Sequence, residues 1–247
     1  MQGCPLRCIF CHNPETWDLN GKTDTYTPQE LVDKILKYKP YFKHNGGVTF
    51  SGGEPLLQKN MIKNTIEYIN SKNCKTDFYF GITTNGTLLD DDFIKYMKEN
   101  KFVNIAYSID GMKETHDLNR RTIDGDGTFD IVQTNAKKLL NCFNEVIAMS
   151  VITRNNLSNL SKNVEYLIDM GFKYINLLFD YSQDWKDEDL REIKKQYNEV
   201  AEIYASKILQ ESDVEIPLID DKIRTYIKDE YNCNEDCKFG MKTINIG

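Results

Sequence analysis

Short apolar runs alternate along most of this chain with longer amphipathic stretches. Runs of strand length occur at residues 48–50, 77–83, 103–109, 146–152 and 174–179. Apolar residues at helical spacing occur at residues 27–39, 62–69, 89–100, 129–140 and 160–170. Strands that alternate with helices of this length indicate parallel strands joined by right-handed crossovers, so the expected fold class is α/β.

Local signals mark two helix ends and one boundary. Thr27-Pro28-Gln29-Glu30 is a capping box with proline at the first helical position, which predicts a helix start. Gly171 follows a helical stretch and predicts a C-cap. After a long charged helical stretch at residues 185–210, the strand–helix alternation stops. We therefore expect a main domain at residues 1–211 and a C-terminal extension at residues 212–247.

Composition narrows the class of protein. The chain has 247 residues, of which 40% are hydrophobic and 28% charged, as in a globular protein with one main core. Its formal charge of -7 argues against a dedicated nucleic-acid binder, because phosphate contacts require clustered Lys and Arg. We find neither a membrane span nor a signal peptide. We expect a cytoplasmic protein, in which the seven cysteines favour metal or redox chemistry over disulfides.

Three cysteines, Cys4, Cys8 and Cys11, lie within eight residues near the start. Three thiolates need one more ligand to complete a tetrahedral zinc site or to ligate every iron of a [4Fe-4S] cluster. The residues leave open a zinc site completed by His12, a haem attachment pattern at residues 8–12, which requires export, and a Cys8–Cys11 redox pair. A cluster with one open iron is the fourth possibility, and it offers a coordination position to a cosubstrate.

The spacing Cys4-x-x-x-Cys8-x-x-Cys11, with Phe10 directly before the third cysteine, resembles the cluster motif of the radical S-adenosylmethionine (SAM) superfamily. In that family three thiolates hold a [4Fe-4S] cluster, and the open iron binds the amino and carboxylate groups of SAM. The resemblance implies that an electron from the cluster cleaves SAM to methionine and a 5'-deoxyadenosyl radical, which abstracts a hydrogen atom. It also implies an electron donor such as flavodoxin or ferredoxin.

Motifs at the ends of three predicted strands resemble the same family. The family's GGE motif, which contacts the SAM amino group, is matched at residues 52–54, and further motifs are matched at residues 83–86, 108–111 and 116–120. An arginine suits a bidentate contact to the SAM carboxylate, although the adjacent Arg121 leaves that assignment open. The resemblance implies this set of SAM-binding residues: Phe10, Gly52, Gly53, Glu54, Asn85, Ser108 and Arg120.

The resemblance, which covers roughly residues 1–205, also implies a partial (β/α)6 barrel. Ligands of parallel α/β folds sit at the carboxyl ends of strands, so a strand is expected before the cysteine loop. Met1 lies three residues before Cys4. We therefore expect five strands and the absence of the first, with a polypeptide that lacks a native N-terminal piece.

The resemblance leaves the substrate open. Residues 11–17 resemble the cysteine loop of activating enzymes for glycyl-radical enzymes, whose target is a glycine on a partner protein. The motifs at residues 108–111 and 116–120 resemble peptide- and protein-modifying enzymes with a SPASM or Twitch extension. We expect a radical SAM enzyme that acts on a peptide or protein, with the activating enzyme as the alternative. A non-catalytic metal-binding module is a third hypothesis.

The remaining cysteines and carboxylates carry weaker expectations. Cys237 with residues 244–247 resembles the start of such an extension, where a hairpin opens an auxiliary iron–sulfur site, and Cys233 is a second candidate ligand. Free thiols are the alternative for this pair. Cys74 and Cys142 are expected to be small buried hydrophobes. Asp110 and Asp180 are candidate proton acceptors, and the sequence does not rank them. These expectations leave the identity of any auxiliary cluster and of the base undecided.

Overall fold

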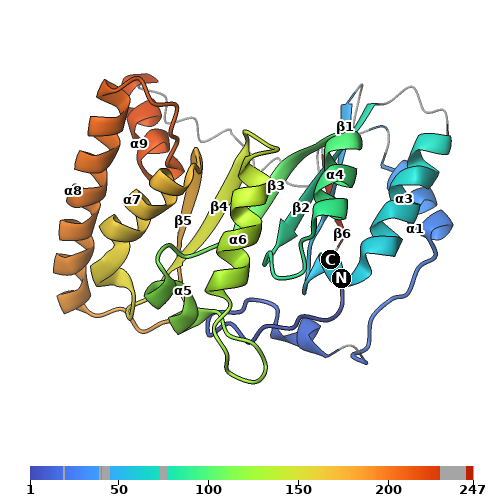
Figure 1. Ribbon diagram of the computed structural model, residues 1–247, viewed down its shortest axis with the longest axis horizontal. Coiled ribbons are helices and arrows are strands. Elements are labelled where there is room, and N and C mark those ends of the chain that lie inside the picture. Colours follow the sequence, from blue (N-terminus) through green and yellow to red (C-terminus); the bar gives the residue numbers. More distant parts are fainter. Residues whose placement is uncertain (19, 39, 41–44, 73–76, 229–242, 247) are drawn as a thin grey trace. The chain divides into compact units, whose positions relative to one another are not determined.

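The computed structural model describes residues 1–247 except 19, 39, 41–44, 73–76, 229–242 and 247. It confirms the α/β class (Figure 1). The five predicted strands are all present, as β1 Asn45–Phe50, β2 Asp77–Thr84, β3 Phe102–Ser108, β4 Val146–Ile152 and β5 Tyr174–Phe179. A sixth strand, β6, is formed by Thr243–Ile246.

The predicted helices are present with ends shifted by a few residues. The α-helices among the described residues are α1 Pro28–Leu36, α3 Lys59–Ser71, α4 Asp91–Glu99, α5 Lys113–Asn119, α6 Phe129–Leu140, α7 Leu160–Met170, α8 Asp187–Leu209 and α9 Pro217–Lys228. Short 3-10 turns occur at Pro14–Trp17, Pro55–Gln58 and Leu157–Asn159. α5 and α9 were not predicted from the sequence. α5 has 7 residues, too few for a helical period to emerge from the sequence.

The two predicted helix ends are confirmed. The Thr27 hydroxyl accepts a hydrogen bond from the Glu30 backbone N–H at 3.2 Å, and the Glu30 carboxylate accepts one from the Thr27 N–H at 2.8 Å. Gly171 closes α7 in the left-handed region, with φ of 106°. A glycine adopts this conformation without the steric cost that a Cβ imposes.

The chain forms two compact units that share one strand. The first holds Met1–Pro5, His12–Ala106 and β6, and the second holds Leu6–Cys11 and Tyr107–Asn232. Hydrogen-bonded neighbours run β3-β2-β1-β6 in the first unit and β5-β4-β3 in the second. β1 pairs with β2, and β4 pairs with β5, both in parallel. The parallel arrangement predicted from the alternating pattern is therefore confirmed.

β6 was not among the strands predicted from the sequence. Thr243–Ile246 forms a strand parallel to β1, in register from Gly47–Thr243 to Phe50–Ile246. Without it, β1 would present unpaired backbone groups at the sheet edge, and a run rich in Thr and Ile suits such pairing. The sheet has six strands among the described residues, the sixth supplied from the C-terminal side.

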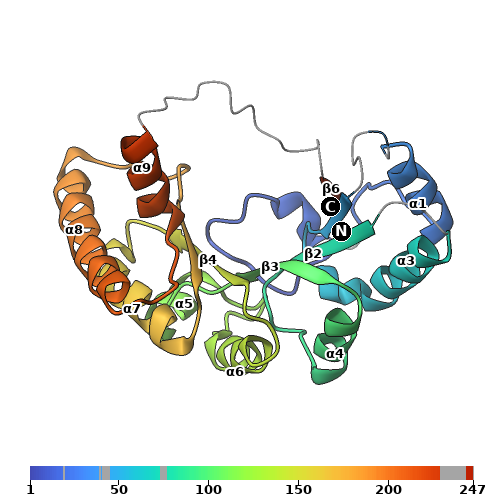
Figure 2. The ribbon, with the colours of Figure 1, turned by 90° about the horizontal axis from the view of Figure 1, so that it is seen from above.

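Each unit buries an apolar face of its helices against its strands. In the first unit α1 and α3 pack side by side and bury Val32, Ile35, Ile62 and Ile66 (Figure 2). In the second unit α7 packs against α8. There the buried Tyr107 hydroxyl donates to the Val132 carbonyl at 2.7 Å. These contacts fix the strand ends that carry the site.

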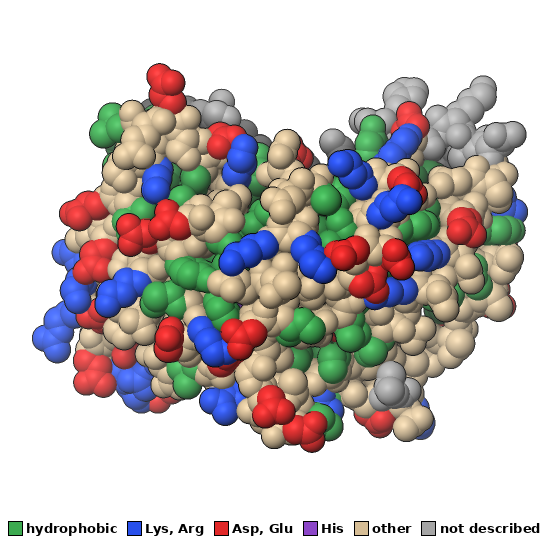
Figure 3. All heavy atoms as spheres, viewed as in Figure 1, with side chains coloured by type: hydrophobic (Ala, Val, Ile, Leu, Met, Phe, Trp, Pro, Cys, Tyr) green, Lys and Arg blue, Asp and Glu red, His purple; other side chains and the backbone are tan. Residues whose placement is uncertain are grey.

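The surface mixes charges of both signs. On the face drawn in Figure 3, Lys and Arg side chains alternate with Asp and Glu. No helix in the described part of the chain is both long and apolar enough to cross a membrane. Cys142 follows the end of α6 and is exposed, so the expectation of a buried Cys142 was wrong. Cys74 lies outside the described residues.

Candidate functional site

In the first unit, the residues before Cys4 dock on the segment that follows β1. The Gly53 N–H donates to the Met1 carbonyl and the Glu54 N–H to the Gly3 carbonyl, each at 2.7 Å. A Cβ on Gly53 would lie 2.1 Å from the Gly3 carbonyl oxygen. The second glycine of the motif is therefore required for the close approach of the cysteine loop.

The Glu54 carboxylate joins the ends of β1 and β2. It is fully buried. One oxygen accepts hydrogen bonds from the Leu56 N–H at 3.0 Å and the Thr84 hydroxyl at 2.7 Å, and the other accepts one from the Asn85 N–H at 2.8 Å. Burial raises the pKa of Glu54, while these three donors act in the opposite direction. Glu54 thus contributes to the site by holding the backbone of Asn85.

The Asn85 side chain lies against Cys4. Its Nδ2 donates to the Cys4 Sγ at 3.7 Å. Its Oδ1 accepts from both the N–H and the hydroxyl of Thr87, at 3.0 and 2.7 Å. Because an oxygen is required on the Thr87 side, the amide orientation is fixed by the network and its NH2 group faces the thiol.

In the second unit, the segment that carries Cys8 pairs with the chain after α5. The Arg7 N–H donates to the Arg121 carbonyl at 2.8 Å and the Ile9 N–H to the Asn119 carbonyl at 3.1 Å. Asn119 is fully buried, and its side-chain amide has no partner among the described residues. A buried amide without a partner is unusual and leaves a polar group for a ligand.

Arg120 is buried between Asp110 and the cysteine loop. Its Nε and Nη2 donate to the two Asp110 carboxylate oxygens, both at 2.8 Å. The guanidinium lies 4.9 Å from the centroid of the Phe10 ring, within cation–π range. Burial lowers the pKa of Arg120, but the neighbouring Asp110 and Cys8 raise it by more, so that the pKa is raised overall. The guanidinium therefore stays charged beside Cys8.

The two neighbouring arginines have different contacts. The exposed Arg121 side chain donates to the carbonyls of Asp117 and Gly125, at 2.8 and 3.3 Å. Arg120 turns inward to the cysteine loop. Arg120 is buried whereas Arg121 is exposed, and the sequence motif contained no signal for this difference.

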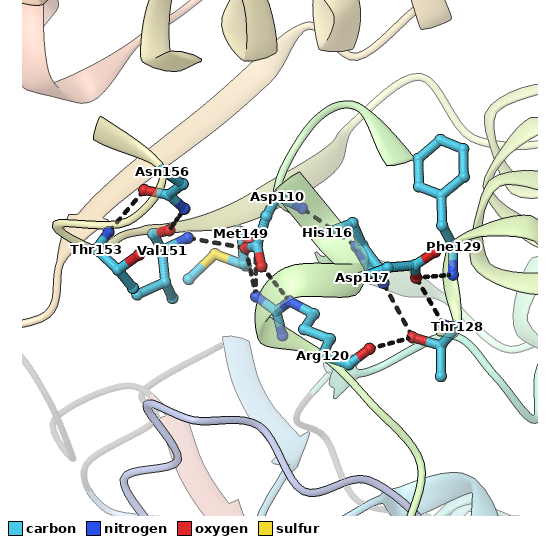
Figure 4. A network of polar contacts seen from close by, with 10 residues as sticks. All are labelled: Asp110, His116, Asp117, Arg120, Thr128, Phe129, Met149, Val151, Thr153 and Asn156. Atoms are coloured by element: carbon cyan, nitrogen blue, oxygen red, sulfur yellow. Dashed lines mark hydrogen bonds and ion pairs between the residues drawn. The ribbon is translucent and has the colours of Figure 1, made fainter. Parts of the chain in front are cut away.

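A chain of hydrogen bonds supports the Asp110–Arg120 pair (Figure 4). The Val151 N–H donates to Asp110 Oδ1 at 3.0 Å. The Asp110 N–H donates to His116 Nδ1 at 3.4 Å, and His116 Nε2 lies 3.1 Å from the Thr128 hydroxyl, which donates to the Arg120 carbonyl. Because Nδ1 accepts the hydrogen bond from Asp110, the proton of the neutral imidazole is on Nε2. Sequence reasoning missed His116 and Thr128 as supporting residues.

The buried His116 predicts a pH-dependent stability. Burial lowers the pKa of His116 from 6.5 to about 4, so between these values the unfolded chain binds a proton that the folded chain does not. The free energy of unfolding is therefore unaffected by His116 above pH 6.5 and decreases as the pH falls toward 4. The difference between the two pKa values corresponds to about 3 kcal/mol. Denaturant unfolding at several pH values should show that the free energy of unfolding falls as the pH is lowered from 6.5 to 4. This dependence on pH should be weaker in a His116→Gln variant.

The exposed His12 provides the matched control for this prediction. A His12→Gln variant should keep the wild-type dependence of the free energy of unfolding on pH. An equal slope in the His116→Gln and wild-type chains would contradict the assignment.

The candidate proton acceptors differ in their contacts. Both Asp110 oxygens accept hydrogen bonds from Arg120. Asp180 is buried after β5, and its Oδ1 accepts from the N–H and hydroxyl of Ser182, at 3.0 and 2.6 Å. Ser108 is half-buried at the end of β3.

The donor set suits an iron–sulfur cluster. Cys4, Cys8 and Cys11 are half-buried thiols. Across the described part of the chain, no three His, Cys, Asp or Glu side chains are grouped closely enough to hold one metal ion. A zinc ion would need its ligands within about 2.3 Å. In a cluster, each thiolate binds a different iron. Asn85 beside Cys4 and Arg120 beside Cys8 are donors that stabilise the thiolate forms. Cys233 and Cys237 lie outside the described residues.

Comparison with known proteins identifies related sequences. The model of the Radical SAM superfamily matches residues 1–167. The pyruvate formate-lyase-activating enzyme of Staphylococcus epidermidis is 47% identical over 76 residues, which are 30% of this chain and 30% of that protein. The enzyme of the same name from Staphylococcus aureus (strain USA300) is 59% identical over 58 residues, or 23% of each chain. The matched segments thus span less than a third of these relatives.

Solved structures share the fold over most of the chain. Native anSMEcpe with bound AdoMet aligns with a TM-score of 0.77 at 24% identity, covering 94% of this chain and 65% of that one. Streptococcus suis SuiB bound to S-adenosylmethionine aligns with a TM-score of 0.58 at 14% identity, covering 86% and 44%. The fold shared with these structures is the predicted partial barrel. With the family match over more than half of its length, this chain is an enzyme of the radical SAM superfamily.

Proposed function

We propose that this enzyme cleaves SAM reductively and abstracts a hydrogen atom from a peptide or protein substrate. Cys4, Cys8 and Cys11 would hold a [4Fe-4S] cluster. When bound, that cluster supplies the electron that splits SAM into methionine and a 5'-deoxyadenosyl radical. The observation that carries the proposal is the docked cysteine loop, in which buried polar groups face Cys4 and Cys8.

The surrounding residues would position the loop and SAM. Gly53 allows the loop to approach the end of β1, Gly52 supplies a backbone turn with φ of 113°, and Glu54 fixes Asn85. Phe10 packs on the Arg120 guanidinium, which Asp110 orients. Ser108 is a candidate contact to polar groups of SAM. A flavodoxin or ferredoxin is the proposed electron donor.

The sequence relatives and one solved structure support a peptide or protein substrate. The sequence relatives are named as activating enzymes of pyruvate formate-lyase, which is a protein. SuiB bound to the precursor peptide SuiA has a similar fold, with a TM-score of 0.56 at 16% identity over 86% of this chain and 46% of that one. The shared feature is a substrate made of amino acids.

Activation of a glycyl-radical enzyme is the second candidate function. The identity of 59% over 58 residues to a pyruvate formate-lyase-activating enzyme favours it. An activating enzyme would leave a stable protein radical, visible by electron paramagnetic resonance, in its partner. A peptide-modifying enzyme would instead change the mass of its product.

Deuterium transfer tests the substrate class. The reconstituted enzyme, SAM and a strong reductant are incubated with a peptide digest from cells grown in deuterated medium, or with the small-molecule extract of the same cells. We expect the peptide digest to stimulate 5'-deoxyadenosine formation and to place deuterium in it. Deuterium acquired from the small-molecule extract and not from the peptides would contradict a peptide or protein substrate.

Three finer expectations stay predictions. They are the auxiliary iron–sulfur site at Cys233 and Cys237, the boundary near residue 211, and the cytoplasmic location. Iron content above four atoms per chain, lost in a Cys233→Ala variant, would support the first.

A further inference from the structure

We propose that Asn85 adjusts the reduction potential of the cluster through a hydrogen bond to the Cys4 thiolate. This inference rests on the proposed function, because it requires a cluster on the cysteine loop. It changes the role expected for Asn85: its donor faces a cluster ligand, whereas the motif resemblance placed it against SAM.

The position of the donor is determined by buried contacts. The backbone N–H of Asn85 is held by Glu54 at 2.8 Å, and the side-chain oxygen is held by both groups of Thr87. Asn85 is itself buried at 9% exposure, so water does not readily replace its contacts. An amide fixed on one side can present its NH2 group to Cys4 at little further entropic cost.

The electrostatic consequence has a definite sign. Uptake of one electron from an external reductant makes the cluster and its three thiolates more negative by one charge. A donor that points at a ligand sulfur stabilises the more negative state more strongly, so it raises the reduction potential. Removal of the Asn85 donor should therefore lower the potential and make the cluster harder to reduce.

Arg120, which lies beside Cys8, should also raise the reduction potential of the cluster. The charged guanidinium lies beside Cys8 in the second unit and is held there by Asp110. Two of the three loop thiolates thus each have a donor fixed by a buried carboxylate, Glu54 in one case and Asp110 in the other. Asn85 is the better test position, because it is neutral and its replacement breaks no ion pair.

The test is a redox titration of the cluster in the reconstituted full chain without SAM. Asn85→Asp keeps an oxygen for Thr87 and removes the donor, and Asn85→Leu removes both. Each variant should reduce the ratio of reduced to oxidised cluster, at one fixed potential, between about threefold and tenfold, where tenfold equals about 59 mV for one electron. Asn100→Asp, at the end of α4, adds the same charge away from Cys4 and should leave the ratio unchanged.

The outcomes separate this inference from the proposed function. A wild-type chain that assembles no [4Fe-4S] cluster overturns the proposed function. A cluster whose potential is the same in wild type and both Asn85 variants overturns the role of Asn85 and leaves the function intact. Loss of the cluster in both variants would show that Asn85 holds the loop in place, and this too would overturn the adjusting role.

Discussion

Replacing Asp110 with asparagine is expected to lower the free energy of unfolding by about 3–5 kcal/mol, the range measured when one partner of a buried ion pair is removed. Asp110 is 1% exposed and Arg120 5%, so neither charge is solvated. The variant leaves the Arg120 guanidinium buried without its counter-charge. Denaturant unfolding of the wild-type and Asp110→Asn chains measures the loss directly.

An exposed ion pair in the same unit gives a matched control. Lys173 and Asp213 lie 2.6 Å apart with exposures of 40% and 70%. Asp213→Asn should lower the free energy of unfolding far less than Asp110→Asn does, because water replaces the lost contact. Replacing Arg120 by Met in the Asp110→Asn background should recover part of the loss, since it removes the unpaired charge. Equal costs at Asp110 and Asp213 would contradict the structural role of the buried pair.

Replacing Gly53 with alanine should displace the cysteine loop. The added methyl group would lie 2.1 Å from the Gly3 carbonyl oxygen and 3.1 Å from that of Met1, and both are backbone atoms that cannot rotate away. Relief of the clash requires loss of the two backbone hydrogen bonds that dock the loop. We expect iron content after reconstitution to fall about tenfold or more, since overpacking of this kind costs more than about 1 kcal/mol.

Gly125 is the control for this substitution. A Cβ there meets nothing within 4 Å, and its cost is limited to the backbone conformation with φ of +89°. Gly125→Ala should therefore bind iron as the wild type does. Wild-type iron content in the Gly53→Ala chain would show that the loop is not docked through Gly53.

The sequence predicted the features that are encoded locally. The capping box at Thr27 and the C-cap at Gly171 depend on neighbours along the chain, and both have the predicted geometry. The five strands between the helices follow from periodicity in the same way. The pairing of β6 with β1 depends on residues about 200 positions apart, which no local pattern specifies.

The motifs supplied the candidate site residues, while the contacts among these residues could not be predicted from the sequence. The motifs contained Asp110, His116 and Arg120, but the sequence does not show that the first and last form a buried pair or that His116 links them to Thr128. Arg120 and Arg121 are equivalent by sequence, and burial alone distinguishes them. Such distinctions arise from tertiary packing.

The central claim is that the docked cysteine loop supports reductive cleavage of SAM. The most direct test is anaerobic reconstitution with iron and sulfide, followed by measurement of 5'-deoxyadenosine formed from SAM under a strong reductant, with Cys8→Ala in parallel. The proposed function predicts a cluster and product with the wild-type chain and neither with the variant. A wild-type chain that carries the cluster and forms no 5'-deoxyadenosine, or a Cys8→Ala chain that forms as much as wild type, would contradict it.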